Sequence, residues 1–175
     1  MRNRIAVCMV VLSHASFAVA APRTIELAKG QTLSMDVPEE LTVSNTPGTE
    51  EMPATVALKD GEGACEIRLK FATPKHIPTK EELKQTLQRS AQRLLADAVE
   101  DTIDVRELPQ SIFVVMYFEV TDKREDAADG RYMLQGLGVS GKYLCQFMML
   151  TKEKDPPARK AVLKALASMR VSEEK

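Results

Sequence analysis

A single stretch with helical periodicity separates two groups of alternating apolar residues, and this order restricts the fold more than any other feature of the chain. Its apolar residues recur at helical spacing: Leu83, Leu87, Ala91, Leu94, Leu95 and Ala98. Thr79 and Glu82 precede this stripe as a capping box, in which each side chain accepts a hydrogen bond from an early backbone N–H group. We therefore predict a helix from about residue 80 to residue 100.

Two hairpins are predicted before this helix. Apolar residues alternate over 24–27 and 33–37, and Lys29-Gly30-Gln31 lies between these segments as a turn. Val56 and Leu58 alternate in the same way, and the segment 65–71 follows the turn at 60–63. The polar segment NTPGTEEMP, residues 45–53, is expected to be a loop because it is rich in residues that interrupt strands.

Strand patterns resume after the helix. A short strand is predicted at 103–105, followed by a turn at Pro109-Gln110, and IFVVMYFEV (112–120) is apolar at both alternating sets of positions, which predicts a central strand covered on both faces. Segments 131–139 and 143–151 predict two more strands. A charged loop precedes the first of them, and a tight turn separates the two. A last helix is expected to begin at Pro156 with Asp155 as its N-cap.

Clustered strands with isolated helices predict an α+β fold. We expect an antiparallel sheet, made of hairpins and a meander, with two helices packed on it as an α/β/α-like layered single domain. The order also resembles the PsbP-like superfamily, which includes DcrB-type bacterial envelope proteins. The segments that carry the resemblance are LSMDVPEELTV, TKEELKQTLQRSAQRLL and AVLKALASMRV. The resemblance implies binding and assembly roles and assigns no functional residue.

The first twenty residues predict export. Arg2 and Arg4 precede an apolar run, and Ala18-Val19-Ala20 is a small-x-small cleavage signal, as in a secretory signal peptide. Cleavage after Ala20 would leave one domain at 21–175 in the periplasm or outside the cell. The chain has 24 Lys and Arg against 25 Asp and Glu, so without Arg2 and Arg4 the net charge is −3. The two signs are interspersed, which argues against a nucleic-acid partner, and no later segment predicts a transmembrane span.

Cys65 and Cys145 are the cysteines left after such a cleavage. Each lies on the apolar side of a predicted strand, so both are expected to point into a core. An even pair in an oxidising compartment predicts a disulfide. The alternative is two buried free thiols, which behave as small apolar side chains.

No catalytic, cofactor or metal site is predicted. GLGVSGKY (136–143) resembles a phosphate-binding loop, but Tyr143 replaces the required Ser or Thr and a strand follows, so a hairpin turn is the better interpretation. His76 is the one histidine beyond the leader and lacks partners for catalysis or for zinc. The acidic residues of 122–130 lack calcium-loop spacing, and the scattered methionines are typical of a core rather than of a copper site.

These observations favour a non-catalytic interaction module that binds another protein, with a toxin-inhibiting immunity protein as one form. Loops commonly carry function, so the predicted partner contacts lie in two of them: Thr49, Glu50, Glu51, Asp122, Lys123, Arg124, Asp126 and Asp129. The alternative is an envelope accessory protein that binds a small molecule or a lipid between sheet and helix, against Leu87, Leu94, Met116 or Phe118. An enzyme with carboxylates brought together by the fold is a third hypothesis.

Overall fold

The computed structural model describes residues 21–49, 52–61, 65–125, 130–154 and 156–173. Its strands form two antiparallel sheets. The small sheet has the order β1-β2-β10 and the large sheet the order β3-β4-β5-β9-β8-β7-β6. The strands are β1 (Ala21–Ala28), β2 (Gln31–Val37), β3 (Leu41–Thr46), β4 (Ala54–Asp60), β5 (Cys65–Ala72), β6 (Arg106–Glu107), β7 (Val114–Thr121), β8 (Tyr132–Ser140), β9 (Tyr143–Thr151) and β10 (Arg170–Glu173).

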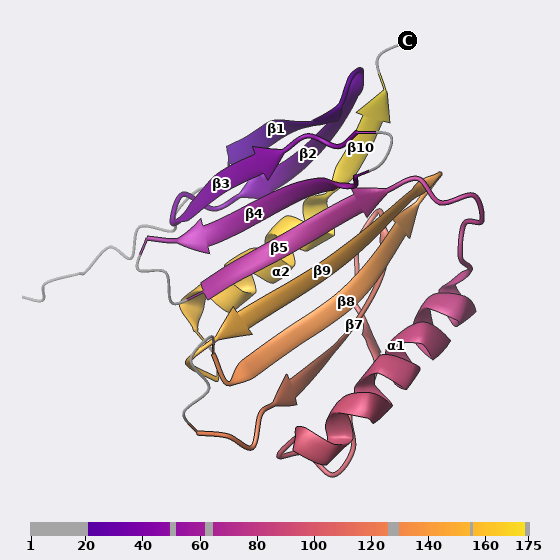
Figure 1. Ribbon diagram of the computed structural model, residues 1–175. Helices are drawn as coiled ribbons and strands as arrows, with labels where there is room; N and C mark the ends of the chain where they lie inside the picture. Colours follow the sequence, from indigo (N-terminus) through magenta and orange to yellow (C-terminus); the bar gives the residue numbers. More distant parts are fainter. Residues whose placement is uncertain (1–20, 50–51, 62–64, 126–129, 155, 174–175) are drawn as a thin grey trace, which may run out of the picture.

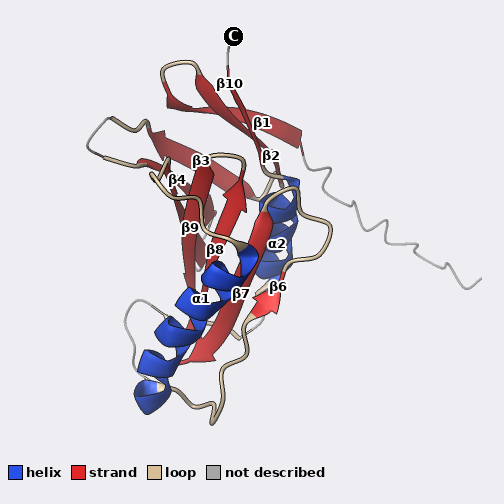
Figure 2. Cartoon of the chain, turned by 90° about the vertical axis from the view of Figure 1, so that its right-hand side faces the viewer, coloured by secondary structure: helices blue, strands red, loops and turns tan. Residues whose placement is uncertain are grey.

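Two helices cover opposite faces of the large sheet (Figures 1 and 2). Helix α1 (Lys80–Leu94) packs on β7 and β8, and a 3-10 turn, η1 (Leu95–Asp97), extends it. Helix α2 (Pro157–Ser168) contacts β5 on the other face and also β2 of the small sheet. The fold is therefore α+β, with antiparallel sheets and two packed helices, as the periodicity predicts. Neither helix is long and apolar enough to cross a membrane.

Each face of the large sheet has its own core. The core on the α2 side joins both sheets to α2 and contains Leu33, Ile67, Phe147 and Leu166, each less than 2% exposed. The core on the α1 side is smaller and packs Leu83 and Leu87 against β7 and β8. Alternation along β7 places Val115 in the first core and Met116 in the second. This explains why β7 is apolar at both sets of positions.

The two predicted hairpins, the strand pair β8–β9 and the capping box of α1 are confirmed. The prediction that 112–120 is the central strand is wrong, because β7 is next to the edge strand β6 and β9 occupies the centre. A strand two places from the centre can still be covered on both faces, and alternate residues of β7 belong to the two cores. The expected strand at 103–105 is also wrong: pairing begins at Arg106 and involves only two residues.

Several helix and strand boundaries differ from the predictions. Helix α1 ends at Leu94 and its 3-10 extension at Asp97, before residue 100. Helix α2 begins one residue later than predicted, with Pro156 at the N-cap and Pro157 at the first helical position. The predicted N-cap Asp155 and the leader-like residues 1–20 lie outside the described residues.

The predicted disulfide between Cys65 and Cys145 is wrong, since both thiols are free. Both side chains are buried in the same core, as their positions in the strands predicted. However, Cys65 is opposite Thr151 and Cys145 is opposite Phe71, so six residues of the paired strands separate them. That separation is about 20 Å along the strands, whereas a disulfide needs Cα atoms within about 7 Å.

The strands give the large sheet two distinct ends. Residues Thr46, Ala54, Ala72, Tyr143 and Ser140 lie at one end, which we name the Tyr143 end. Residues Leu41, Asp60, Cys65, Thr151 and Thr121 lie at the other, which we name the Thr151 end. The strand β9 runs the whole distance between them, roughly 27 Å at 3.4 Å per residue.

Candidate functional site

The two predicted contact loops lie at opposite ends of the large sheet. The loop containing Thr49 follows β3 at the Tyr143 end, whereas the loop containing Asp122, Lys123 and Arg124 follows β7 at the Thr151 end. They therefore do not form one surface. The remaining residues predicted to contact a partner lie outside the described residues: Glu50, Glu51, Asp126 and Asp129.

The described part of the 122–130 loop is held by internal contacts. Arg124 donates side-chain and backbone hydrogen bonds to the Asp122 carboxylate, which lower its pKa to about 2. Lys123 donates from its Nζ to the Ala96 carbonyl oxygen at 3.1 Å. Lys123 therefore links the residues after β7 to the 3-10 turn η1. At the other end, the backbone N–H of Met52 donates to the Thr49 hydroxyl at 3.1 Å, which closes a local turn.

The segment GLGVSGKY is a hairpin between β8 and β9, as predicted. Gly141 has a φ of 54°, a conformation that glycine adopts without steric cost. Gly136 has a different role, because the Phe147 ring on β9 lies directly over it. Lys142 pairs with Glu173 of β10 at 2.5 Å. Strand β9 follows the turn directly, so the segment has no helix N-terminus at which a phosphate would bind.

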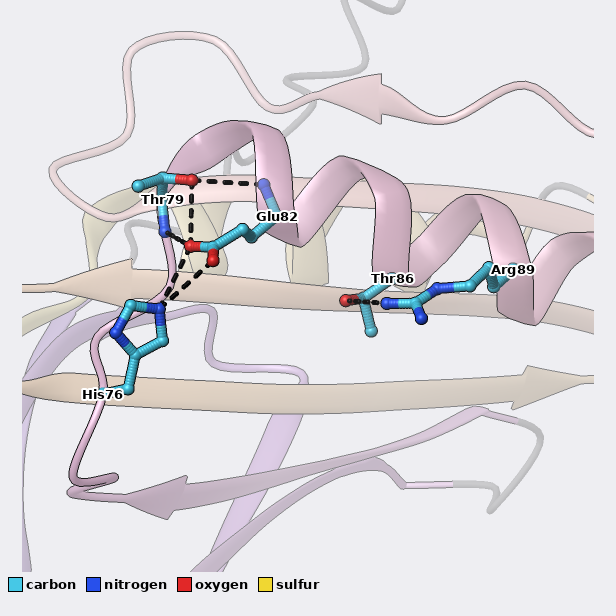
Figure 3. A network of polar contacts seen from close by, with 5 residues as sticks. All are labelled: His76, Thr79, Glu82, Thr86 and Arg89. Atoms are coloured by element: carbon cyan, nitrogen blue, oxygen red, sulfur yellow. Dashed lines mark hydrogen bonds and ion pairs between the residues drawn. The ribbon is translucent and has the colours of Figure 1, made fainter.

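His76 belongs to the start of helix α1 (Figure 3). Its Nε2 lies 3.2 Å from the Glu82 carboxylate, and its side chain is 75% exposed. The same carboxylate accepts a hydrogen bond from the Thr79 backbone N–H at 2.7 Å. His76 is thus an exposed neighbour of the capping box. Among the described residues, no group of three or more His, Cys, Asp or Glu side chains is arranged to hold a metal ion.

The residues predicted to line a lipid site are packed in the core on the α1 side. Leu87, Met116 and Phe118 are at most 3% exposed there. Leu94 is half-buried and borders a cavity of about 150 Å³ near the end of α1. A larger cavity of about 280 Å³ lies at the Tyr143 end, between the Thr49 loop, Leu27 and Tyr143.

A cavity of about 340 Å³ lies at the Thr151 end, where β7, β8 and β9 meet the first turn of α2. Its floor includes Leu134 and Met149. Its polar wall comes from segments far apart in the sequence: Glu100, Glu119, Thr121, Tyr132, Thr151, Lys154 and Arg159. We refer to it as the Thr151-end pocket. The sequence analysis did not predict this pocket. Thr121 on β7 and Thr151 on β9, which are polar residues at core-facing positions, could have indicated it.

Two carboxylates of this pocket are held in place. Glu100 accepts hydrogen bonds from the backbone N–H of Thr121 at 2.9 Å and from its hydroxyl at 2.6 Å. Burial opposes ionisation of Glu100, but these bonds and the charge of Lys154 outweigh it and lower the pKa. Glu119 lies between two guanidinium groups, pairing with Arg159 and, at 3.4 Å, with Arg106.

The lowered pKa of Glu100 restricts the chemistry available to the pocket. A general acid that protonates a leaving group near neutral pH needs a raised carboxyl pKa. Glu100 has the opposite shift, so it remains an anionic hydrogen-bond acceptor. Glu100 is therefore not suited to act as a general acid near neutral pH.

The outward face of β3, β4, β5 and β9 is the second feature of interest. On this face, helix α1 covers the neighbouring strands β7 and β8, and no described helix covers the other four strands (Figure 1). Helix α2 contacts β5 from the opposite face. Glu66 lies between Lys59 at 3.1 Å and Arg68 at 2.6 Å, and the strand register places Met148 beside Arg68. Met148 is 42% exposed. We name this surface the open face.

The open face is basic on a chain of negative net charge. Its outward positions contribute the cations Lys59, Arg68 and Lys70 against the single carboxylate of Glu66. The full chain has a formal net charge of −1. Cations therefore outnumber carboxylates on the open face.

No protein-family model matches the chain, and no curated protein shows significant similarity to it.

Proposed function

We propose that this protein is an exported, non-catalytic interaction module that binds another protein through the open face. The observation that carries the proposal is the basic, helix-free surface with an exposed methionine at its centre. Arg and Met are enriched in protein interfaces, and this face presents Arg68 beside Met148, which is 42% exposed.

The charge of the open face defines the partner's chemistry. Three cations against one carboxylate favour a partner surface rich in Asp and Glu, with an apolar depression for Met148. Complementary charge mainly raises the association rate and selects against basic partners. A toxin with an acidic surface would make the protein an immunity-type inhibitor, which is one form of this proposal.

A pull-down with charge-reversed variants tests the proposal. The full chain, tagged after Lys175, is isolated from its own cells, and stoichiometric proteins are identified by mass spectrometry. We expect one acidic partner with the wild type and its loss with Arg68→Glu/Lys70→Glu. The matched control is Lys160→Glu/Lys164→Glu on the exposed side of α2, which reverses the same charge on the opposite face.

Two results would contradict this proposal. One is that the wild type elutes without a stoichiometric protein. The other is that both charge-reversed variants retain the partner equally, which would place the contact elsewhere. Export is tested in the same preparation, because cleavage of the predicted leader gives an intact mass that starts at Ala21.

A small-molecule binding protein is the second candidate function. The Thr151-end pocket favours it, because a cavity with an apolar floor and a few placed polar groups is the usual form of such sites.

A further inference from the structure

The cavity of about 280 Å³ at the Tyr143 end has an apolar floor, and we name it the Tyr143-end cavity. Both sheets line it, since Leu27 comes from β1, Phe71 from β5 and Tyr143 from β9. These three residues are at most 7% exposed and belong to the core on the α2 side. Met52 also lines the cavity and is 62% exposed, so it lies at the outer edge. The cavity therefore offers two aromatic rings and two aliphatic side chains for apolar contact.

Local contacts hold the walls of this cavity in place. The backbone N–H of Gly48 donates to the Leu27 carbonyl oxygen at 2.6 Å, which ties the segment after β3 to β1. Gly48 also packs closely on β4, since a Cβ atom there would lie 2.7 Å from the Ala54 backbone nitrogen. The Tyr143 hydroxyl donates to the Glu173 carboxylate of β10. The site is therefore largely formed before any ligand binds, which lowers the cost of binding.

The polar side chains of the lining are uncharged. Among the described residues, they are Gln31, Thr49 and Thr73. Thr49 already accepts a hydrogen bond from the Met52 backbone. Within the described part of the chain, the Gln31 amide and the Thr73 hydroxyl have no hydrogen-bond partner. Both groups can donate as well as accept, so a neutral polar group on a ligand would find two partners.

A charged ligand group would find no opposite charge in this lining. Lys142 and Glu173 lie beside Tyr143, but they pair with each other at 2.5 Å, and neither is among the described residues that line the cavity. Burying a charge without a partner is much more costly than burying a hydrogen-bonded neutral group. The lining therefore selects for uncharged molecules.

From this arrangement we infer that the Tyr143-end cavity binds a small, uncharged aromatic compound that carries one amide or hydroxyl group. The ligand ring would pack against Phe71 and Tyr143, because aromatic rings favour offset or edge-to-face contact. Its polar group would bond with Gln31 and Thr73. The volume is just below the roughly 300–1,000 Å³ of typical small-molecule sites, which limits the ligand to about one ring. The lining includes none of the charged residues of the open face, so the inference is independent of the proposed protein contact.

Three probes of matching size test the inference: benzamide is neutral, benzoate is an anion, and benzylamine is a cation at neutral pH. Binding to the full chain is measured by chemical-shift titration in NMR, which reports both the affinity and the location. We expect benzamide to bind, with the largest shifts at the backbone amides around Gln31 and Thr73. The two charged probes should bind roughly tenfold more weakly, because the lining leaves their charge unpaired.

The exposed Thr73 allows the selectivity to be changed at a site that is not in the core. Thr73→Asp places an anion in the lining and should reverse the preference, so that benzylamine binds more tightly than benzamide. The matched control is Ser44→Asp on β3, which adds the same charge to the open face and should leave all three affinities unchanged. Gln31→Leu should weaken the binding of benzamide, but not that of toluene, which has no polar group.

Three outcomes would overturn the inference. If benzamide causes no shifts, or shifts only outside the lining, the cavity does not take aromatic compounds. Equal affinity for the three probes would show that the uncharged lining does not select the ligand. An unchanged preference in Thr73→Asp would show that Thr73 does not contact the ligand. If Thr73→Asp does not fold, as judged by circular dichroism, Gln31→Leu decides, and equal weakening of benzamide and toluene would then overturn the inference.

Discussion

Two glycines of the segment GLGVSGKY, which resembles a phosphate-binding loop, have different structural roles. Gly141 serves the turn through its positive φ, whereas Gly136 allows close packing inside the sheet. A Cβ atom at Gly136 would lie 2.1 Å from Phe147 Cζ and 2.6 Å from the Met116 carbonyl oxygen. Phe147 could rotate only against a packed core, and the Met116 carbonyl belongs to the backbone of β7.

We therefore expect Gly136→Ala to lower the free energy of unfolding by roughly 1–3 kcal/mol, the range for inserting extra volume into a packed core. The control is Gly61→Ala, since no atom lies within 4 Å of a Cβ at that position. Gly61→Ala should change the free energy by less than about 1 kcal/mol. Urea denaturation of both variants measures the difference, and equal values would contradict the packing role of Gly136.

Glu100 makes stability depend on pH. Its pKa in the folded protein is below the ordinary value of 4.5, so the unfolded chain binds the proton more readily. The stabilisation is consequently present above pH 4.5 and is lost as the pH falls towards the folded pKa. Thermal unfolding of wild type and Glu100→Gln should show a stability difference that shrinks from about pH 6 to about pH 3. A difference that grows on acidification would contradict this sign.

The helix α1 is the element whose start the sequence specifies best. Thr79 and Glu82 exchange hydrogen bonds in the capping box, and Glu82 also lies beside His76 (Figure 3). Loss of the Thr79 hydroxyl leaves an early backbone N–H of the helix without its acceptor. We expect Thr79→Ala to lower the free energy of unfolding by about 1 kcal/mol.

Thr86 provides the matched control on the same helix. It lies on the exposed face, where its hydroxyl takes only a long contact of 3.4 Å from Arg89. Alanine has the higher helix propensity, so Thr86→Ala should be neutral or slightly stabilising. Chemical denaturation of the two variants makes the comparison, and equal destabilisation by both would mean that the capping box is unimportant to the fold.

Local signals account for the elements that could be predicted. The hairpins have alternating apolar residues and a glycine turn, and α1 has its own cap. Strands β3 and β10 were missed for different reasons. β3 presents Thr42, Ser44 and Thr46 on the open face, so it has few apolar residues. Its end also overlaps the segment 45–53, whose composition predicts a loop. β10 directly follows α2, and its pairing with β2 joins residues about 140 positions apart, as between Thr32 and Ser172.

The cysteine pair and the Thr151-end pocket could be predicted only in part, because both depend on the tertiary fold. The prediction that each cysteine lies on the apolar side of its strand is confirmed. The distance between the cysteines, however, depends on the register of β5 and β9. The Thr151-end pocket combines Glu100, Glu119, Lys154 and Arg159 from four separate segments, which only the tertiary fold brings together. Alternation indicates which way a side chain points, and it contains no information on the partner across the sheet.

At the scale of the whole molecule, one sheet separates two cores and should couple them. β7 contributes residues to both cores, so neither can lose its packing without disturbing the other. We expect residues 21–175 to unfold as a single cooperative unit, as small domains usually do. Cys65 and Cys145 report on this independently, because they are buried at opposite ends of the sheet.

Both thiols should be unreactive in the native protein. Burial, and then the nearby Asp60 carboxylate, raise the pKa of Cys65 to about 11. Burial also raises the pKa of Cys145. Since the thiolate is the reactive form, alkylation should require unfolding at both sites. Without reductant, we expect iodoacetamide to label both cysteines at the same guanidinium concentration, which should match the unfolding transition measured by circular dichroism.

Peptide mapping of each labelled site distinguishes the possible failures. If Cys65 is labelled at a lower guanidinium concentration than Cys145, the Thr151 end unfolds before the rest of the sheet. If Cys145 is labelled first, the Tyr143 end unfolds before the rest. Cysteines that remain unlabelled after complete unfolding, and become labelled only when reductant is added, would show a disulfide and would contradict the observed register of β5 and β9. Coincident labelling requires that both ends of the sheet unfold in one step.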